Sequence, residues 1–162
     1  MSNLQDLLNN IPQEGTIEWI GIRPAKKAEL DAIEQAEISI ESGLVGDHYT
    51  GKSRKRQVTL IQKEHLQTVA SILQKENIDP KLTRRNIVIA GINLLSLKDK
   101  QFQIGEVILE MTGLCHPCSR MEENLGAGGY SAMRGHGGIN AKVIQGGKIK
   151  VGDKVKFLKE KD

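Results

Sequence analysis

The only two cysteines of this chain stand two residues apart, in the sequence CHPC that spans residues 115–118. Two thiols at this spacing have their sulfurs close together, which suits dithiol exchange, half of a zinc site, or one metal ligand beside a second thiol. A structural zinc site needs four Cys or His ligands, and its second half would have to come from the scattered His48, His65 and His136. Zinc is therefore the least favoured of the three chemistries.

The residues around the two thiols favour a chemical role for them. Residues 107–112 are typical of a strand and residues 119–125 could form a short helix, an order that suits dithiol exchange. The motif nevertheless lies late in the chain instead of after the first strand of a βαβ unit. Two buried, inert thiols are the alternative, because free cysteine often packs as a small hydrophobic residue. The flanking His116, Ser119 and Arg120 make this alternative less attractive.

A glycine-rich, basic stretch follows from Gly126 to Gly147. Its bare amides could form a nest for an anion, with phosphate the natural candidate, although the stretch is neither a Walker loop nor a dinucleotide fingerprint. A flexible hairpin connection is an equally good interpretation. Several basic residues, if brought together at one barrel mouth, would bind a phosphorylated ligand. These residues are Lys26-Lys27, Arg54-Lys55-Arg56, Arg84-Arg85, Arg120 and Arg134.

The composition of the chain limits the classes of protein to which it can belong. A chain of 162 residues with 38% hydrophobic, 27% charged and 3% aromatic residues indicates one compact, soluble domain with an aliphatic core. The formal net charge of +3 is too mild to indicate nucleic-acid binding. No stretch approaches membrane-spanning length and no signal peptide is recognisable, so we expect a cytoplasmic protein with no membrane partner. In that reducing compartment a close cysteine pair favours catalysis, redox chemistry or metal binding over a structural disulfide.

The hydrophobic pattern predicts a chain in which strands dominate. Residues 63–77 form the one clear amphipathic helix, and residues 3–11 form a short one that we expect to pack on the body. The strands are short and are not regularly interleaved with helices, which argues for a mainly β fold, a barrel carrying a few helices. The predicted strands are 16–22, 37–40, 57–61, 86–90, 106–112, 139–144 and 149–158, the last interrupted by a turn at Gly152-Asp153.

Five segments, taken in order, resemble a stand-alone MOSC domain, the module named from the C-terminal part of molybdenum cofactor sulfurases. They are GLVGDH at 43–48, RQVTLI at 56–61, RRNIVIAG at 84–91, CHPC at 115–118, and the region from GGINAKV at 137–143 to GD at 152–153. No single segment is specific, but their order and spacing are. The resemblance covers roughly residues 14–157, which predicts a single domain over 1–162 with the helical segment 3–11 before the MOSC domain.

The resemblance implies a mainly β fold with peripheral helices, a MOSC-type β-barrel like that of pyruvate kinase. It also implies binding of the molybdenum cofactor, a pyranopterin dithiolene that carries a terminal phosphate. In family members that reduce N-hydroxylated substrates, one cysteine thiolate ligates the metal, and the matching residue here is Cys118. A soft thiolate suits such a metal. The resemblance therefore makes Cys118 both the metal ligand and the catalytic residue.

Other site residues follow from the resemblance as well. Arg84 and Asn86 match the family's Arg-x-Asn element beside the pterin, where a guanidinium could bind phosphate and an amide could pair with pterin edges. Lys26, Arg56 and the backbone around His116 lie where family members approach the cofactor. Asp47 and His48 are interpreted as part of a turn, and Cys115 has no role assigned by the resemblance.

The expected function is reduction of a small N-hydroxylated or N-oxide substrate. The sequence has no recognisable flavin, haem or iron–sulfur motif, so electrons would come from a partner reductase. One alternative is a carrier that delivers sulfur or molybdenum cofactor without turnover, with Cys118 able to hold a persulfide. Another is a thiol–disulfide oxidoreductase, which would need both cysteines and no cofactor.

Overall fold

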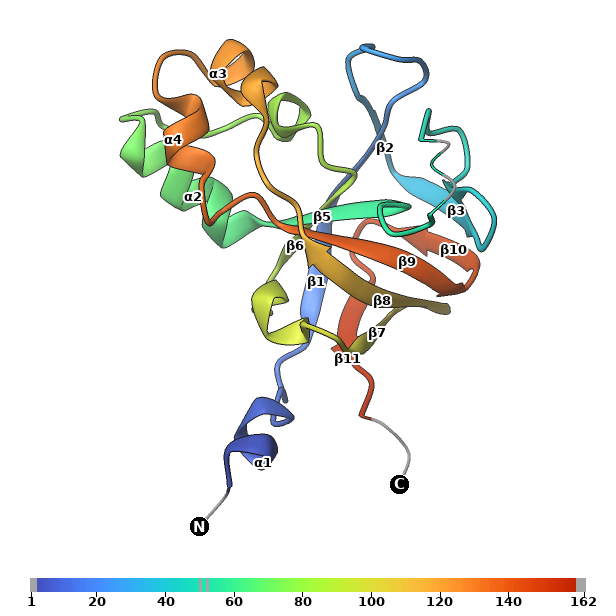
Figure 1. Ribbon diagram of the computed structural model, residues 1–162. Coiled ribbons are helices and arrows are strands. Elements are labelled where there is room, and N and C mark those ends of the chain that lie inside the picture. Colours follow the sequence, from blue (N-terminus) through green and yellow to red (C-terminus); the bar gives the residue numbers. More distant parts are fainter. Residues whose placement is uncertain (1–2, 50, 52, 160–162) are drawn as a thin grey trace.

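The fold is a closed β-barrel with helices on one side, seen in a computed structural model that describes residues 3–49, 51 and 53–159 (Figure 1). The barrel strands are, in spatial order, β11 (Lys154–Phe157), β7 (Gln101–Ile104), β8 (Val107–Leu114), β9 (Ile139–Gln145), β5 (Val58–Gln62), β6 (Ile87–Ala90) and β1 (Gly15–Ile22). Pairing of Gly15 with Val155 and of Thr16 with Lys154 joins the first and last of these strands and closes the ring. The mainly β barrel predicted from the sequence is confirmed.

Strand direction is mixed within the barrel. The β5–β6 pair is parallel, and α2 (Lys63–Ile72) lies in the connection between these two strands. The other barrel pairs are antiparallel. Strand β2 (Asp31–Ile33) extends β1 on the outside, and a small second sheet contains β10 (Gly147–Lys150), β3 (Gln35–Ser39) and β4 (Gly43–Leu44).

The alternation of side chains along the strands creates two apolar clusters. One set of alternate residues fills the barrel, including Val58, Leu60, Ile87, Ile89 and Ala141. The intervening residues of β5 and β6 point outward and pack under helices. These helices are α2, α3 (Ser119–Leu125) and α4 (Gly129–Met133), which Figure 1 shows together on one side of the barrel. The outer face of β5 and β6 is therefore partly covered by a helical layer.

Helix α2 is shorter than the predicted 63–77 because its C-terminus is fixed by a left-handed residue. Gln74 has φ 56°, and the Lys75 amide donates to the Ala70 carbonyl at 2.9 Å while the Gln74 amide donates to Ser71. This is the hydrogen-bond pattern of a Schellman motif, which ends a helix. Strand β7, helix α4 and two short 3-10 helices at Pro80–Thr83 and Leu94–Leu97 were not predicted.

Helix α1 (Leu4–Leu8) forms as predicted, but the expectation that it packs on the body is wrong. None of its residues is buried, and Leu4, Leu7 and Leu8 are 71%, 59% and 51% exposed. Only Ile11, beyond the helix, packs against the barrel core. The physical reason is position: β1 begins at the end of the barrel away from the helical layer, so α1 has no apolar partner there (Figure 1). Across the described ranges, no helix has the length and apolarity that a membrane crossing needs.

Candidate functional site

Three polar side chains and one glycine form a row across four neighbouring strands, on the outer face of the barrel. Thr59 of β5 is the register partner of Asn140 in β9, and Asn140 is in turn the partner of Gly113 in β8. Asn86, just before β6, completes the row because the Thr59 amide and hydroxyl donate to its Oδ1 at 3.2 and 3.0 Å. We call Asn86, Thr59, Asn140 and Gly113 the polar row. One end of the row is close to the CHPC segment, because Asn140 donates to the carbonyl of Leu114, the residue before Cys115.

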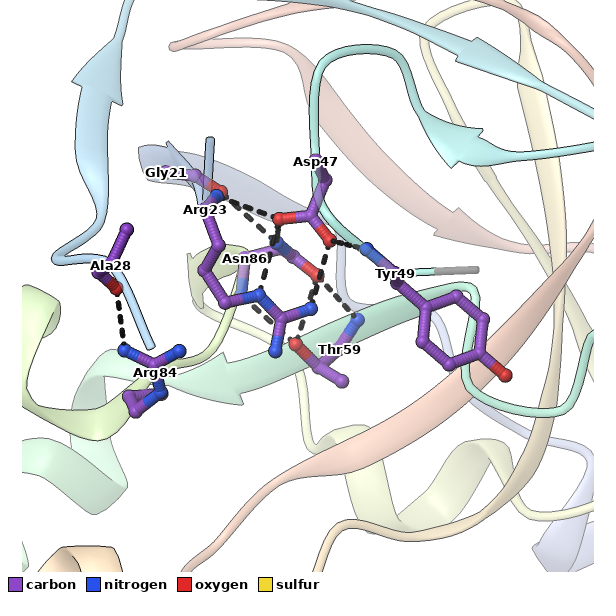
Figure 2. A network of polar contacts seen from close by, with 8 residues as sticks. All are labelled: Gly21, Arg23, Ala28, Asp47, Tyr49, Thr59, Arg84 and Asn86. Atoms are coloured by element: carbon purple, nitrogen blue, oxygen red, sulfur yellow. Dashed lines mark hydrogen bonds and ion pairs between the residues drawn. The ribbon is translucent and has the colours of Figure 1, made fainter. Parts of the chain in front are cut away.

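The Asn86 side chain is completely buried, and protein groups satisfy it. Its Nδ2 donates to the Gly21 carbonyl at 3.1 Å and to Asp47 Oδ1 at 3.2 Å, while its Oδ1 accepts from Thr59 (Figure 2). The amide therefore ties β1, β5 and Asp47 together. Its predicted direct contact with the pterin stays a prediction, and the geometry gives Asn86 a positioning role.

Asp47 is the buried carboxylate of the site. Its side chain is 1% exposed and accepts from Arg23 through Nε at 3.2 Å, through a terminal guanidinium nitrogen at 2.8 Å and through the backbone amide at 2.7 Å. Burial raises the pKa of Asp47, but the hydrogen bonds and charge of Arg23 and the Tyr49 amide hold it below the ordinary value of 3.8. The predicted turn exists, since the Asp47 amide donates to Leu44, yet the carboxylate does more than make a turn.

Two guanidinium groups, those of Arg84 and Arg120, lie close to each other near the segment that carries Cys118. Arg84 is half-buried, has φ 60° and donates to the Ala28 carbonyl at 2.7 Å. Burial and the charges of Arg120 and Arg23 lower its pKa, while Cys118 and Asp47 raise it. Arg120 donates to the adjacent Lys27 carbonyl at 3.2 Å, so the guanidinium groups of Arg84 and Arg120 lie close together although like charges repel. Such a cluster favours an anion, because guanidinium groups form strong hydrogen bonds with phosphate oxygens.

The side chain of Arg85 holds the backbone of the CHPC segment in place through hydrogen bonds. Its buried guanidinium donates to the carbonyls of Gly137, Thr83 and Cys115 at 2.7, 3.0 and 3.1 Å, and to that of His116 at 3.3 Å. Burial lowers its pKa, the two cysteines raise it, and the charges of Arg56 and Arg23 lower it further. Arg85 therefore joins the start of β6, the thiol segment and the segment before β9.

The two thiols lie in different surroundings, and both are free. Cys115 is 2% exposed, and its amide donates to the Gly138 carbonyl at 2.9 Å. Cys118 is exposed and immediately precedes α3, where its carbonyl accepts from the Met121 amide. The structure thus presents one accessible thiol and one packed thiol.

The glycine-rich stretch is a built part of the fold and not a flexible hairpin connection. A Cβ on Gly137 would lie 2.2 Å from the Cys115 carbonyl oxygen, and one on Gly138 would lie 2.0 Å from that of Leu60. These two glycines allow close backbone packing. The amides of Gly128 and Tyr130 donate to the Glu122 carboxylate at 2.9 and 3.0 Å, so the anion on them is a side chain of this chain. These hydrogen bonds lower the pKa of Glu122.

The predicted site residues are only partly brought together. Arg84 donates to the carbonyl next to the one that Arg120 contacts, which brings Arg84 near the segment of Cys118, whereas Arg56 is exposed. Lys26 and the His116 side chain are exposed, and the structure shows no hydrogen bond from either within the described residues. Sequence reasoning missed Arg23 altogether and saw Arg85 only as a member of a basic pair.

The sequence profile of the MOSC domain family matches residues 46–156. The chain belongs to the MOSC domain family. Strand β1 lies before the matched residues, although the barrel cannot close without it. This family is associated with binding of the molybdenum cofactor. No curated protein matches the sequence.

Solved structures share the fold at low sequence identity. YuaD from Bacillus subtilis superposes with a TM-score of 0.79 at 17% identity, covering 91% of this chain and 97% of YuaD. YiiM from Geobacillus stearothermophilus gives a TM-score of 0.74 at 13% identity, covering 90% and 75% of the two chains. YiiM from Escherichia coli gives 0.68 at 16% identity, covering 90% and 70%. The MOSC-type barrel expected from the sequence is confirmed.

The residues present fit the cofactor that the family implies. Within the described ranges no three His, Cys, Asp or Glu side chains could hold a metal ion by themselves. An exposed thiol close to the guanidinium groups of Arg84 and Arg120 is instead a donor set for a ligand that brings its own sulfur atoms and carries a phosphate.

Proposed function

We propose that this protein binds the molybdenum cofactor, with Cys118 as the metal ligand, and reduces small N-hydroxylated or N-oxide substrates. The observation that carries the proposal is one exposed, free thiol that stands two residues before Arg120. The guanidinium groups of Arg120 and Arg84 lie close together there, since they donate to two consecutive carbonyls, those of Lys27 and Ala28. In a family associated with this cofactor, such a site supplies both a soft ligand and a place for phosphate.

Each side chain near the thiol has a separable task in this proposal. Arg84 and Arg120 bind the phosphate, and Arg23 joins them while Asp47 holds its guanidinium in place. Arg85 orients the carbonyls of the CHPC segment and so sets the direction in which Cys118 leaves the backbone. Lys26, Arg56 and the His116 backbone are further cofactor contacts in this proposal.

When bound, the cofactor would supply the two-electron chemistry that converts R–NH–OH, two electrons and two protons into R–NH₂ and water. The electron donor in this proposal is a separate reductase protein. Dithiol exchange is the alternative, because it needs one exposed attacking thiol and works with a buried resolving thiol. It requires Cys115, whereas cofactor binding through Cys118 does not.

The test is cofactor content after expression in a host that makes molybdenum cofactor. Molybdenum and pterin are measured per protein for wild type, Cys118→Ser and Cys115→Ala under reducing conditions, with thermal unfolding as the check on folding. We expect near-stoichiometric contents in wild type and Cys115→Ala, and loss of molybdenum in Cys118→Ser. Folded wild-type protein that lacks both pterin and molybdenum in such a host would sink the proposal.

Catalysis is then measured with reduced methyl viologen in place of the unknown donor. Hydroxylaminopurine and benzamidoxime serve as substrates, and the amine product is quantified. Turnover that disappears in Cys118→Ser supports the reductase. Full cofactor occupancy without turnover on either substrate would favour a carrier instead.

A further inference from the structure

One buried polar atom of the site has no partner. In the part of the chain that the structure describes, Asn140 Oδ1 is the only buried side-chain nitrogen or oxygen without a hydrogen bond. Asn140 is 9% exposed and lies in β9, in the middle of the polar row. Buried acceptors of this kind are uncommon in native proteins, which makes each one a candidate for contact with a ligand or an ordered water.

The hydrogen bond that Asn140 Nδ2 donates fixes the orientation of the side-chain amide. Its Nδ2 donates to the Leu114 carbonyl oxygen at 3.1 Å. A carbonyl can only accept, so exchanging the oxygen and nitrogen of the amide would place two acceptors against each other. Oδ1 therefore points away from Leu114 and has no hydrogen-bond partner among the described residues.

The neighbours of Asn140 in the row leave this oxygen free. The Thr59 hydroxyl on one side donates to Asn86 and so has no proton for Asn140. Gly113 on the other side has no side chain, and a Cβ there would meet nothing within 4 Å. Ile139 and Ala141 point into the barrel core. Neither neighbour in the row therefore supplies a donor to this oxygen, and the position beside Gly113 is open.

The two ends of the polar row offer different chemical groups to a ligand. Arg23 lies near Asn86 at the β6 end, where both contact Asp47, whereas Asn140 lies two strands away, roughly 10 Å at the usual strand spacing. Arg85 reaches the side of Asn140, but its guanidinium donates to the carbonyls of the backbone there. A ligand whose phosphate binds at the Asn86 end of the row can therefore contact Asn140 through another part of the molecule, an uncharged group. A neutral carboxamide oxygen binds an N–H or O–H donor.

We propose that Asn140 is a further ligand-binding residue, whose Oδ1 accepts a hydrogen bond from an N–H or O–H group of the molecule bound at this site. The inference rests on the proposed function. Two sources share the chemistry: a ring N–H of the pterin, and the N–H or O–H of an N-hydroxylated substrate.

The experiment compares wild type with Asn140→Leu, which has a similar shape but no acceptor, and with Asn140→Ala, which does not require an apolar side chain to fit. Gln145→Leu is the matched control, because Gln145 in the same strand also donates to a carbonyl, that of Glu106, but lies at the far end of β9. Pterin retention during dialysis, KM for hydroxylaminopurine and thermal unfolding are measured for all four proteins.

Loss of one neutral hydrogen bond should weaken ligand binding by about three- to tenfold. Faster pterin loss in both Asn140 variants would identify the cofactor as donor, whereas unchanged retention with a raised KM would identify the substrate. Retention and KM equal to those of wild type and Gln145→Leu would overturn the inference about Asn140 alone. Wild-type protein that retains no pterin would overturn the proposed function and this inference together.

Discussion

Two cysteines separated by two residues differ sharply in exposure, because Cys115 packs in the protein and Cys118 stands at the start of α3. The pair therefore offers one nucleophilic sulfur, and reactivity of a thiol requires access to solvent. This asymmetry assigns different tasks to residues that a sequence motif would treat alike.

We predict that one thiol of the native, cofactor-free protein reacts rapidly with Ellman's reagent and that both react after denaturation in guanidinium chloride. Cys118→Ser should remove the fast phase, whereas Cys115→Ser should keep it. Two fast thiols in native wild type would contradict the burial of Cys115. Circular dichroism of each variant checks that the fold is retained.

Asp47 should contribute to stability in a pH-dependent way. Replacing it with Asn removes the charge that holds Arg23 and should lower the free energy of unfolding at pH 7 by about 1–3 kcal/mol. Because the folded-state pKa of Asp47 is below 3.8, this contribution is complete above that pH and is lost as the pH falls through the folded-state value.

Urea unfolding of wild type and Asp47→Asn from pH 7 to pH 2.5 measures this difference. The gap between the two proteins should narrow on acidification, and the exposed Asp31→Asn serves as control. A gap that widens below pH 4 would show that the carboxylate is not stabilised as described.

For single residues, the sequence predicted those that belong to a recognisable motif. It did not predict residues that contact a motif only in the folded protein. Cys118 and Arg84 belong to short segments with recognisable order. Arg23 is a lone arginine whose partner Asp47 is 24 residues away, so only the fold reveals their contact. Asn140 is a single polar residue in an apolar strand, and its missing hydrogen-bond partner is a property of three-dimensional packing.

At the scale of elements, the approach of β9 to β5 depends on Gly138. Its φ is 89° and a Cβ would meet the Leu60 carbonyl, whereas Gly135 has φ 81° and open space. Gly135→Ala should therefore cost only the left-handed penalty of about 1–2 kcal/mol. Gly138→Ala should cost more than about 3 kcal/mol, because the strands must also separate.

Chemical denaturation of the two glycine variants against wild type gives the comparison. Equal losses of stability would mean that crowding at Leu60 is relieved without cost. The matched φ values make the difference between the variants a measure of the interstrand contact itself.

Elements with a clear period were predictable and those without one were not. Runs of strand-forming residues identified β1, β5, β6, β8 and β9, and the residues after the thiols indicated the short helix α3. Strand β7 was not predicted from the sequence, because only two of its side chains, Phe102 and Ile104, point into the barrel. Helix α4 escaped because its glycine-rich start disfavours a helix, and the Glu122 carboxylate that anchors it comes from another element.

For the whole molecule, α1 stands apart from the barrel and should add little to its stability. Deleting residues 1–9 keeps Ile11, which packs on the core, and should shift Tm by less than about 2 °C, because α1 has no buried residue. Differential scanning calorimetry of the shortened and full chains checks this. A large drop in Tm would show that the three exposed leucines are covered in solution.

The pairing of β1 with β11 has a consequence for how the chain folds. The ring joins residues 15–16 to 154–155, so it cannot close until residue 155 has left the ribosome. Contacts between such distant segments also slow folding, because a long loop must be closed before the pairing stabilises it. Until then the edges of β1 and β7 remain open to other strands, and a chaperone that shields them would protect the nascent protein from aggregation.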